Sequence, residues 1–455
     1  MFMEILDGTI VSTSAPRVGA ALHVPDAEIG LVITAYLITL AVLIPLSGWM
    51  VARVGTRKVF LTAIVIFTVA SLLCSTSVNL GELVAWRIVQ GAGGAMMVPV
   101  GRLAVLATTA KSDLMRMISY IVWPALIAPV VAPLAGGFIT TYASWRWLFL
   151  INIPLGVIAF AFAVRLVPSV PPRTPPRLDW VGVVLTCLSL GGLTYAASLL
   201  AQPAPPWATV IAAGVPAVAL LVLAVRHLLR APDPLIDLRT LRIPTFRVAV
   251  ASGSLSFMAI GAVPFLLPLL FENVFGWSAV RSGAVVLFVF VGNIGIKPAT
   301  SYLLNRFTFR VVLLAASLSL AASVIAAGLV TGRTPVPVIM VIAVISGMAR
   351  SVSGTSYNTL SFCDIPEDQM PHANSLSATT QQLSLGLGVA AATIALRAGS
   401  PIGHLLPGGA TVKSAYTIAF VIIALLPVCA AVGVARLHAD AGSAARIPAT
   451  AVTES

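Results

Sequence analysis

The chain has 455 residues, of which 58% are hydrophobic and only 9% are charged, and its formal net charge is +12. Soluble proteins carry about a quarter charged residues, so this composition excludes a soluble domain and indicates a protein that lies in a bilayer. The positive charge does not indicate nucleic-acid binding, because the basic residues stand singly or in small groups between apolar stretches. The four cysteines have no paired spacing, so we expect free thiols and no metal site.

Apolar stretches of about 20 residues can cross the hydrocarbon core as helices, and they recur along the whole chain. They predict an all-α integral membrane protein with about fourteen transmembrane helices. We expect a six-helix half over 1–167, a linker with two extra helices over 168–246, a second half over 247–436 and a disordered cytoplasmic tail over 437–455. The predicted helices lie near 1–21, 29–52, 58–78, 80–108, 117–140, 146–167, 180–200, 207–228, 247–271, 279–304, 309–331, 335–360, 376–397 and 413–436.

The first predicted helix contains an acid, Asp7, in the stretch LDGTIV. An ionisable residue inside the membrane is a functional-site hypothesis by default, so Asp7 is a candidate for proton coupling. The alternative is that Asp7 is hydrated at the frayed end of a short helix, and we expect the same of Glu4. Only fifteen residues precede Pro16, about 22 Å of helix. We therefore expect the natural start to lie upstream, and no cleavable signal pattern is present.

A short polar break, GWMVARVGTRKVF, follows the second predicted helix and holds Arg53, Arg57 and Lys58. With the start placed in the cytoplasm, seventeen Lys and Arg fall in inner loops, six in outer loops and four inside helices. This bias favours the cytoplasmic side for both termini. The break is therefore predicted to be a cytoplasmic turn.

The fourth predicted helix carries RIVQGAGG, with Arg87 well inside the apolar stretch. Arg87 could tune Asp7 or relay a proton; the alternative is that it snorkels to the outer interface. Gly91 and the glycines after it favour close helix packing. The fifth predicted helix contains a cluster of helix-bending and small residues, which indicates either a functional bend or ordinary packing: Pro129, Pro133, Gly136 and Gly137.

The second half repeats the first at an offset of 253 residues. Pro45 aligns with Pro298, Arg53 with Arg306, Arg57 with Arg310 and Gly30 with Gly283. Two related six-helix halves explain this register, and transporters built from such repeats bind substrate between them.

Four further residues inside predicted helices have open roles. Lys297 and Arg350 could line a substrate cavity, and Arg102 and Lys297 are expected to snorkel inward. Trp123 fits an interfacial aromatic belt or, alternatively, the wall of the cavity.

These motifs together resemble the major facilitator superfamily, and in particular its fourteen-helix branch of drug–proton antiporters. The resemblance covers nearly the whole chain. The family's loop between helices two and three is matched by Gly48, Arg53, Gly55, Arg57 and Lys58, and its helix-four motif by Arg87, Gln90, Gly91 and Gly93. LDGTIVSTSAP is similar to the branch's first helix, and APLAGG retains Pro133, Gly136 and Gly137 of the exporter signature in helix five.

The resemblance implies that the loop residues, Gln90, Gly91, Pro133, Gly136, Gly137, Arg306 and Arg310 take part in conformational gating. The family's loop acid is missing from both halves, where Ala52 and Asn305 stand instead. Since that acid helps to hold one conformation, its usual lock is absent here. Restoring it at Ala52 is expected to shift the chain toward the family's resting state.

The leading functional prediction is a secondary exporter of small amphipathic molecules, driven by proton antiport through alternating access. No resident cofactor is expected, and the proton gradient supplies the energy. A transport-deficient sensor of the same fold is the alternative, and an enzyme is disfavoured because HExxH and GxSxG are absent. The expected location is a bacterial inner membrane, and the expected partners are substrate, protons and lipid, without nucleic acid. A monomer suffices, and a periplasmic adaptor is compatible with the prediction.

Overall fold

The computed structural model describes residues 2–24, 26–106, 142–167, 177–200, 205–404, 411–438 and 441–442, with isolated positions at 113, 117, 128, 131–132, 135–136, 138–139 and 202. Within these residues the regular elements are helices and no strand occurs, which confirms the all-α prediction. Eleven of the described helices are long and apolar enough to span a membrane, or twelve if one bent pair counts as a span. The predicted helix at 117–140 lies largely outside the described residues, so the count of fourteen is approached but not reached.

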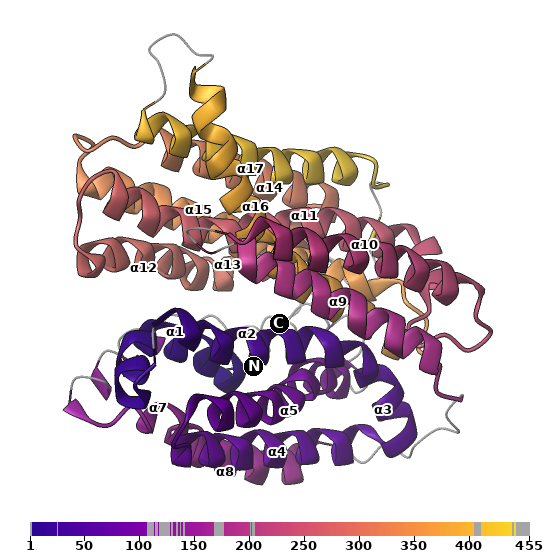
Figure 1. The fold of residues 1–455 in the computed structure, drawn as a ribbon. Helices are drawn as coiled ribbons and strands as arrows, with labels where there is room; N and C mark the ends of the chain where they lie inside the picture. Colours follow the sequence, from indigo (N-terminus) through magenta and orange to yellow (C-terminus); the bar gives the residue numbers. More distant parts are fainter. Residues whose placement is uncertain are drawn as a thin grey trace.

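The first part of the chain forms one bundle, drawn in indigo and purple in Figure 1. Its tightest pair is formed by α4 and α5, and α2 packs on the other side of α5. The described elements of this bundle are α1 (Phe2–Leu22), α2 (Asp26–Leu43), η1 (Ile44–Leu46), α3 (Ser47–Val54), α4 (Thr56–Thr76), α5 (Leu80–Leu106), α7 (Trp147–Leu150) and α8 (Asn152–Leu166).

The last part of the chain forms a second bundle, drawn from rose to yellow in Figure 1. It contains α11 (Pro244–Asn273), α12 (Ala279–Gly295), α13 (Lys297–Arg306), α14 (Phe309–Leu329), α15 (Val336–Cys363), α16 (Met370–His404) and α17 (Val412–Ala435). Between the bundles in sequence come α9 (Trp180–Leu200), α10 (Trp207–Arg230) and the short η3 (Leu238–Arg242). Because α9 contacts both α2 and α16, the extra helix pair lies against both bundles.

The second helix of each half is interrupted at the same aligned position. Pro45 lies in the 3₁₀ turn η1 between α2 and α3, and Pro298 begins α13 after the break at Ile296. Proline lacks the N–H that would continue an α-helical ladder, so both breaks follow from the sequence. In the second half the two pieces meet at 46°. The span expected over 279–304 is therefore a bent pair of helices, and its break aligns with the one in the first half.

Glycine allows the helix backbones to touch at the centre of each bundle. A Cβ added at Gly93 of α5 would lie 2.7 Å from the backbone nitrogen of Phe67 on α4. One added at Gly347 of α15 would lie 1.8 Å from the carbonyl oxygen of Val289 on α12. Association of membrane helices depends on such close backbone contact, because lipid tails provide no hydrophobic force between helices. These contacts fix α4 against α5 and α12 against α15.

Candidate functional site

The carboxylate of Asp7 is completely buried where α1, α5 and α8 meet. It forms an ion pair with the Nη1 atom of Arg87. Its Oδ1 atom accepts hydrogen bonds from Gln90 Nε2 at 3.0 Å and from Asn152 Nδ2 at 2.8 Å. The motif residues Asp7, Arg87 and Gln90 are thus brought together in one network, and the expectation of a hydrated Asp7 was wrong.

Arg87 is also completely buried, so it does not snorkel to the interface. Its guanidinium lies 4.1 Å from the ring centre of Tyr36, a cation–π contact with α2. The Nε atom donates to the carbonyl oxygen of Val32 at 3.3 Å, and Nη1 also donates to Gln90 Oε1 at 2.7 Å. Arg87 therefore joins α1, α2 and α5 around one buried charge pair.

A second layer of polar residues holds this network in place. Gln90 Nε2 donates to Ser71 Oγ of α4 at 2.6 Å, and the thiol of Cys74 donates to Gln90 Oε1 at 3.8 Å. Sequence reasoning did not include Tyr36, Ser71 or Asn152. Asn152 begins α8 in the apolar stretch INIPL, and its polarity there was a signal that could have been used. Five helices, α1, α2, α4, α5 and α8, thus contribute to the network around Asp7 and Arg87.

A second acid of α1, Glu4, faces a different cation. Its Oε2 atom is buried and accepts no hydrogen bond, which differs from the expected hydration. The positive charges that act on Glu4 are the amino terminus and Arg102 of α5, and no salt bridge joins Glu4 to Arg102. Arg102 is 6% exposed, so it does not reach the interface as expected. Its Nη2 atom instead donates to Gln381 Oε1 of α16 at 3.4 Å.

The two halves meet through uncharged groups near the beginning of α16. Ser375 Oγ lies 3.0 Å from Ser47 Oγ and accepts from the backbone nitrogen of Gly48 at 3.1 Å. Asn374 Nδ2 donates to the carbonyl oxygen of Pro99 at 2.9 Å. Together with Arg102–Gln381 these hydrogen bonds are called the inter-half contact below. It includes Gly48, one of the predicted gating residues.

The other predicted gating residues of the first half lie beside this contact without joining it. Gly55 ends α3 with φ of 92°, a value that favours glycine, and so allows the turn into α4. Arg57 Nη2 donates to the carbonyl oxygen of Val164 on α8, while Arg53 and Lys58 are exposed. Gly91 packs on α2, since an added Cβ would lie 2.8 Å from Thr39 Cβ.

The matching arginines of the second half are placed like Arg53 and Arg57. Arg306 ends α13 and is exposed, and Arg310 in the first turn of α14 is half-buried. Gly136 is a buried helical residue. Trp123, Pro133 and Gly137 lie outside the described residues, so their predicted roles stay predictions.

Two cations lie inside the second bundle. Lys297 is 3% exposed and its Nζ atom donates to Thr355 Oγ1, so it does not snorkel as expected. Arg350 Nη1 donates to the carbonyl oxygen of Ile260 at 3.3 Å, and its guanidinium lies 5.9 Å from the ring centre of Phe290. Among the described residues the salt bridges are Arg87–Asp7 and His227–Asp179, so neither cation has an acidic partner there.

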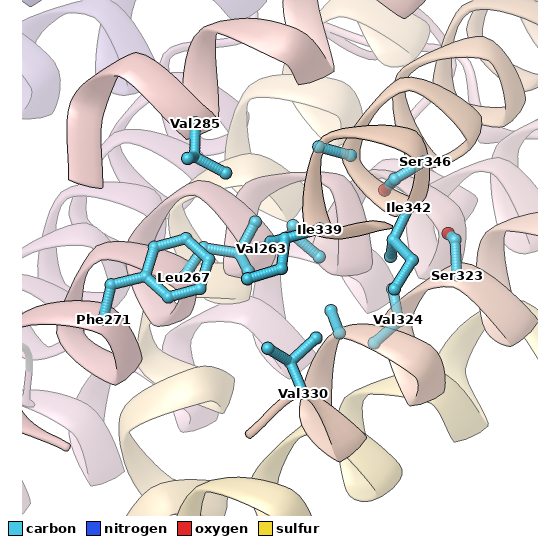
Figure 2. A pocket seen from close by; sticks show the side chains of 12 residues that line it. Val263, Leu267, Phe271, Val285, Ser323, Val324, Val330, Ile339, Ile342 and Ser346 are labelled. Atoms are coloured by element: carbon cyan, nitrogen blue, oxygen red, sulfur yellow. The ribbon is translucent and has the colours of Figure 1, made fainter. Parts of the chain in front are cut away.

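Two pockets of the second bundle are small, whereas a third, lined by residues of α13, α14 and α15 such as Leu303 and Met348, holds about 450 Å³. Figure 2 shows one of the small pockets, lined by apolar side chains such as Val263, Leu267 and Val324. It holds about 10 Å³, at the lower limit for one water molecule. A second, polar pocket of about 10 Å³ lies between α11, α15 and α16 and includes Gln381. Neither small pocket accommodates an amphipathic molecule in this conformation.

The described residues also bear on other site chemistries. They contain no group of three or more His, Cys, Asp or Glu side chains that could hold a metal ion. All four cysteines are free.

Comparisons with known proteins agree with the fold. The family model described as Major Facilitator Superfamily matches residues 1–389. A relative from Serratia proteamaculans that bears the name multidrug resistance protein MdtD is 35% identical over 443 residues, which cover 96% of this chain and 92% of the relative. A relative of the same name from Cronobacter sakazakii is 36% identical over 408 residues, covering 89% of this chain and 85% of the relative.

Solved structures are similar in fold at low sequence identity. The human organic anion transporter MFSD10 has a TM-score of 0.67 at 14% identity, with 95% of this chain and 96% of that chain covered. The proton:xylose symporter XylE bound to 6-bromo-6-deoxy-D-glucose has a TM-score of 0.62 at 13% identity, with 95% and 92% covered. At these identities the likeness concerns the fold alone.

Proposed function

Because the chain belongs to the major facilitator superfamily and is a multi-span transporter of that family rather than an enzyme, we propose that it exports small amphipathic molecules by proton antiport. Drug-like compounds are the proposed substrate class. The name of the relatives, which refers to multidrug resistance, supports this choice. The bacterial origin of these relatives supports a location in the inner membrane, and we place both termini in the cytoplasm from the distribution of basic loops.

The observation that carries the proposal is the completely buried pair of Asp7 and Arg87. Taking two charges out of water costs several kcal/mol per ion, so a buried pair is weak evidence for stability. Ionisable residues inside membrane proteins commonly mark ion and proton pathways. The first helix of this transporter, which holds Asp7 and a second acid with a buried oxygen, Glu4, therefore supplies the groups for proton coupling. The proton gradient supplies the energy without a resident cofactor.

Alternating access is the proposed mechanism. The inter-half contact closes one end of the molecule, the end that the basic loops predict to be cytoplasmic. Breaking these few hydrogen bonds would open that end at a modest cost, because a neutral one is worth about 1 kcal/mol and the one from Arg102, a charged donor, about 1.5–3 kcal/mol. One chain contains both bundles, so a monomer suffices for the cycle.

A sensor that binds without transport was the alternative, because the loop acids are replaced by Ala52 and Asn305. The inter-half contact supplies a closure that needs neither acid, which favours the transporter.

The test is flux in proteoliposomes that contain the purified chain. We expect an imposed pH gradient to drive accumulation of a neutral amphipathic antibiotic such as radiolabelled chloramphenicol. We also expect that adding the antibiotic starts proton movement through the protein in the opposite direction. Vesicles without protein and vesicles without a gradient are the controls. Binding without gradient-driven accumulation would support the sensor instead.

A further inference from the structure

The two acids of α1 differ in their partners, because Asp7 is ion-paired and Glu4 is not. Glu4 and Asp7 are three residues apart, so both face the same side of the helix. Asp7 accepts hydrogen bonds from Arg87, Gln90 and Asn152. Glu4 has a buried Oε2 atom without any partner. Of the two carboxyl groups, Glu4 is the one whose neutral form suits its surroundings.

Protonation of Asp7 would be costly for the rest of the site. Arg87 is completely buried, and within the described part of the chain its acidic partner at salt-bridge distance is Asp7. Breaking a buried pair from one side leaves an uncompensated buried charge, which is strongly destabilising. Asp7 is therefore better suited to a permanent charge that holds α1, α5 and α8 together than to a proton that comes and goes.

Arg102 connects Glu4 to the second bundle. Its Nη1 atom is buried without a hydrogen-bond partner, while its Nη2 atom reaches Gln381 across the inter-half contact at 3.4 Å. A carboxylate at Glu4 would attract this guanidinium, whereas a neutral carboxylic acid would not. The other titratable groups that act on Glu4 are the amino terminus, Asp7 on its own helix and Tyr36 of α2, whose hydroxyl donates to the Glu4 carbonyl oxygen at 3.4 Å.

We infer that Glu4 is the residue that takes up and releases the exchanged proton. Arg102 then changes its hydrogen-bond partner with the protonation state of Glu4 and so links that state to the inter-half contact. With Glu4 protonated, Arg102 bonds Gln381 and the contact is closed, as in this structure. With Glu4 ionised, Arg102 turns toward the carboxylate, the bond to Gln381 is lost and the contact opens. The inference rests on the proposed proton antiport, and it identifies the group that carries the proton.

The experiment measures conformation against pH and needs no substrate. Spin labels are attached to the purified full chain at Arg165→Cys and Glu367→Cys, two exposed positions at the inter-half end, after replacement of the four native cysteines. In the otherwise unchanged chain we expect the short label-to-label distance to dominate at acid pH and a longer distance to appear at alkaline pH. Glu4→Gln, which is always neutral, should keep the short distance at every pH.

Three further variants test the assignment. Arg102→Gln should remove the pH response as well, because no guanidinium is then attracted to the ionised Glu4 and away from Gln381. Glu4→Asp keeps an acid at this position and should restore a response, which a merely structural role of Glu4 would not explain. Glu272→Gln is the matched control, since Glu272 is an exposed acid of α11, and it should respond like the unchanged chain.

The outcomes separate this inference from the proposed function. A full pH response in Glu4→Gln, or no response in the unchanged chain, overturns the inference whatever the transport result. A Glu4-dependent response in a chain that shows no proton-driven flux would support the switch while removing the antiport. Proton-driven flux that survives in Glu4→Gln overturns the assignment of the carrier and leaves the antiport in place.

Discussion

At the scale of single residues, Asp7 is the most constrained group of the site. Its carboxylate accepts from three side chains on two other helices and compensates the buried charge of Arg87. We expect Asp7→Asn to reduce proton-driven export to the background of empty vesicles, since Arg87 is then left without a counterion. The loss of one partner from a buried pair should also lower stability by about 3–5 kcal/mol. Flux and thermal unfolding of the purified variant measure both effects.

The readouts for Asp7→Asn distinguish it from Glu4→Gln. Insertion into the membrane should be unchanged, as checked by yield and by monodispersity in detergent. Glu4→Gln should keep substrate exchange without a gradient, whereas Asp7→Asn should lose it because the helices around Arg87 separate. Normal drug-dependent proton flux in Asp7→Asn would remove this residue from the mechanism.

Sequence alone identified part of this site. Asp7 and Arg87 stood out because charges inside apolar helices are rare, and Gln90 followed from its motif. Asn152 and Tyr36 did not, because their roles depend on how α8 and α2 pack against α1 and α5, which helical periodicity does not encode. The same holds for Glu4, which was expected to be hydrated, and for Arg102, which was expected to snorkel, because tertiary packing buries polar atoms of both.

At the scale of helices, closure depends on how closely α3 approaches α16. A Cβ added at Gly48 would lie 3.1 Å from both the Pro371 carbonyl oxygen and Ser375 Oγ, which is tighter than most real contacts. We expect Gly48→Val to push α3 away from α16 and to weaken the hydrogen bond from the Gly48 nitrogen to Ser375. Disulfide formation between cysteines introduced at Ser47 and Ser375 should then become several-fold slower than in the Gly48 background. An unchanged rate of cross-linking would show that α3 is not part of the closure.

The missing loop acid can be tested on the same helix. Ala52 lines a pocket of about 170 Å³ together with Asp179, Asp233, Asp368 and the single cation Arg177. A new carboxylate would enter a site that already holds three acids, where like charges within a Debye length of about 8 Å repel. We therefore expect Ala52→Asp not to strengthen the closed state, which revises the expectation from sequence alone. If cysteines introduced at Ser47 and Ser375 became better protected from labelling reagents in Ala52→Asp, this prediction would be contradicted. Ala52→Asn is the uncharged control.

At the scale of the whole molecule, the two halves share a fold but differ in their buried charges. The repeat at an offset of 253 residues aligned Pro45 with Pro298, and the structure breaks both helices there because proline acts locally on the helix ladder. It did not predict that acids would accompany the cations only in the first half. Glu4 and Asp7 face Arg102 and Arg87 there, whereas Lys297 and Arg350 lie among neutral partners.

This asymmetry predicts the charge of the substrate. A buried charge without a partner is costly to desolvate, so a cavity between the halves that borders Lys297 and Arg350 should disfavour dications and accept neutral or anionic amphipathic compounds. The described acids of the second half, Glu272, Asp364, Glu367 and Asp368, are all exposed, which leaves these two cations uncompensated. The measurement is a resistance panel in a host that lacks its own pumps, expressing either this chain or Arg350→Ala. The unchanged chain should protect against neutral and acidic compounds, and Arg350→Ala should lose protection against the acidic ones first. Strong protection against dicationic antiseptics, with none against neutral or acidic compounds, would show that the substrate meets the acids of the first half rather than the cations of the second.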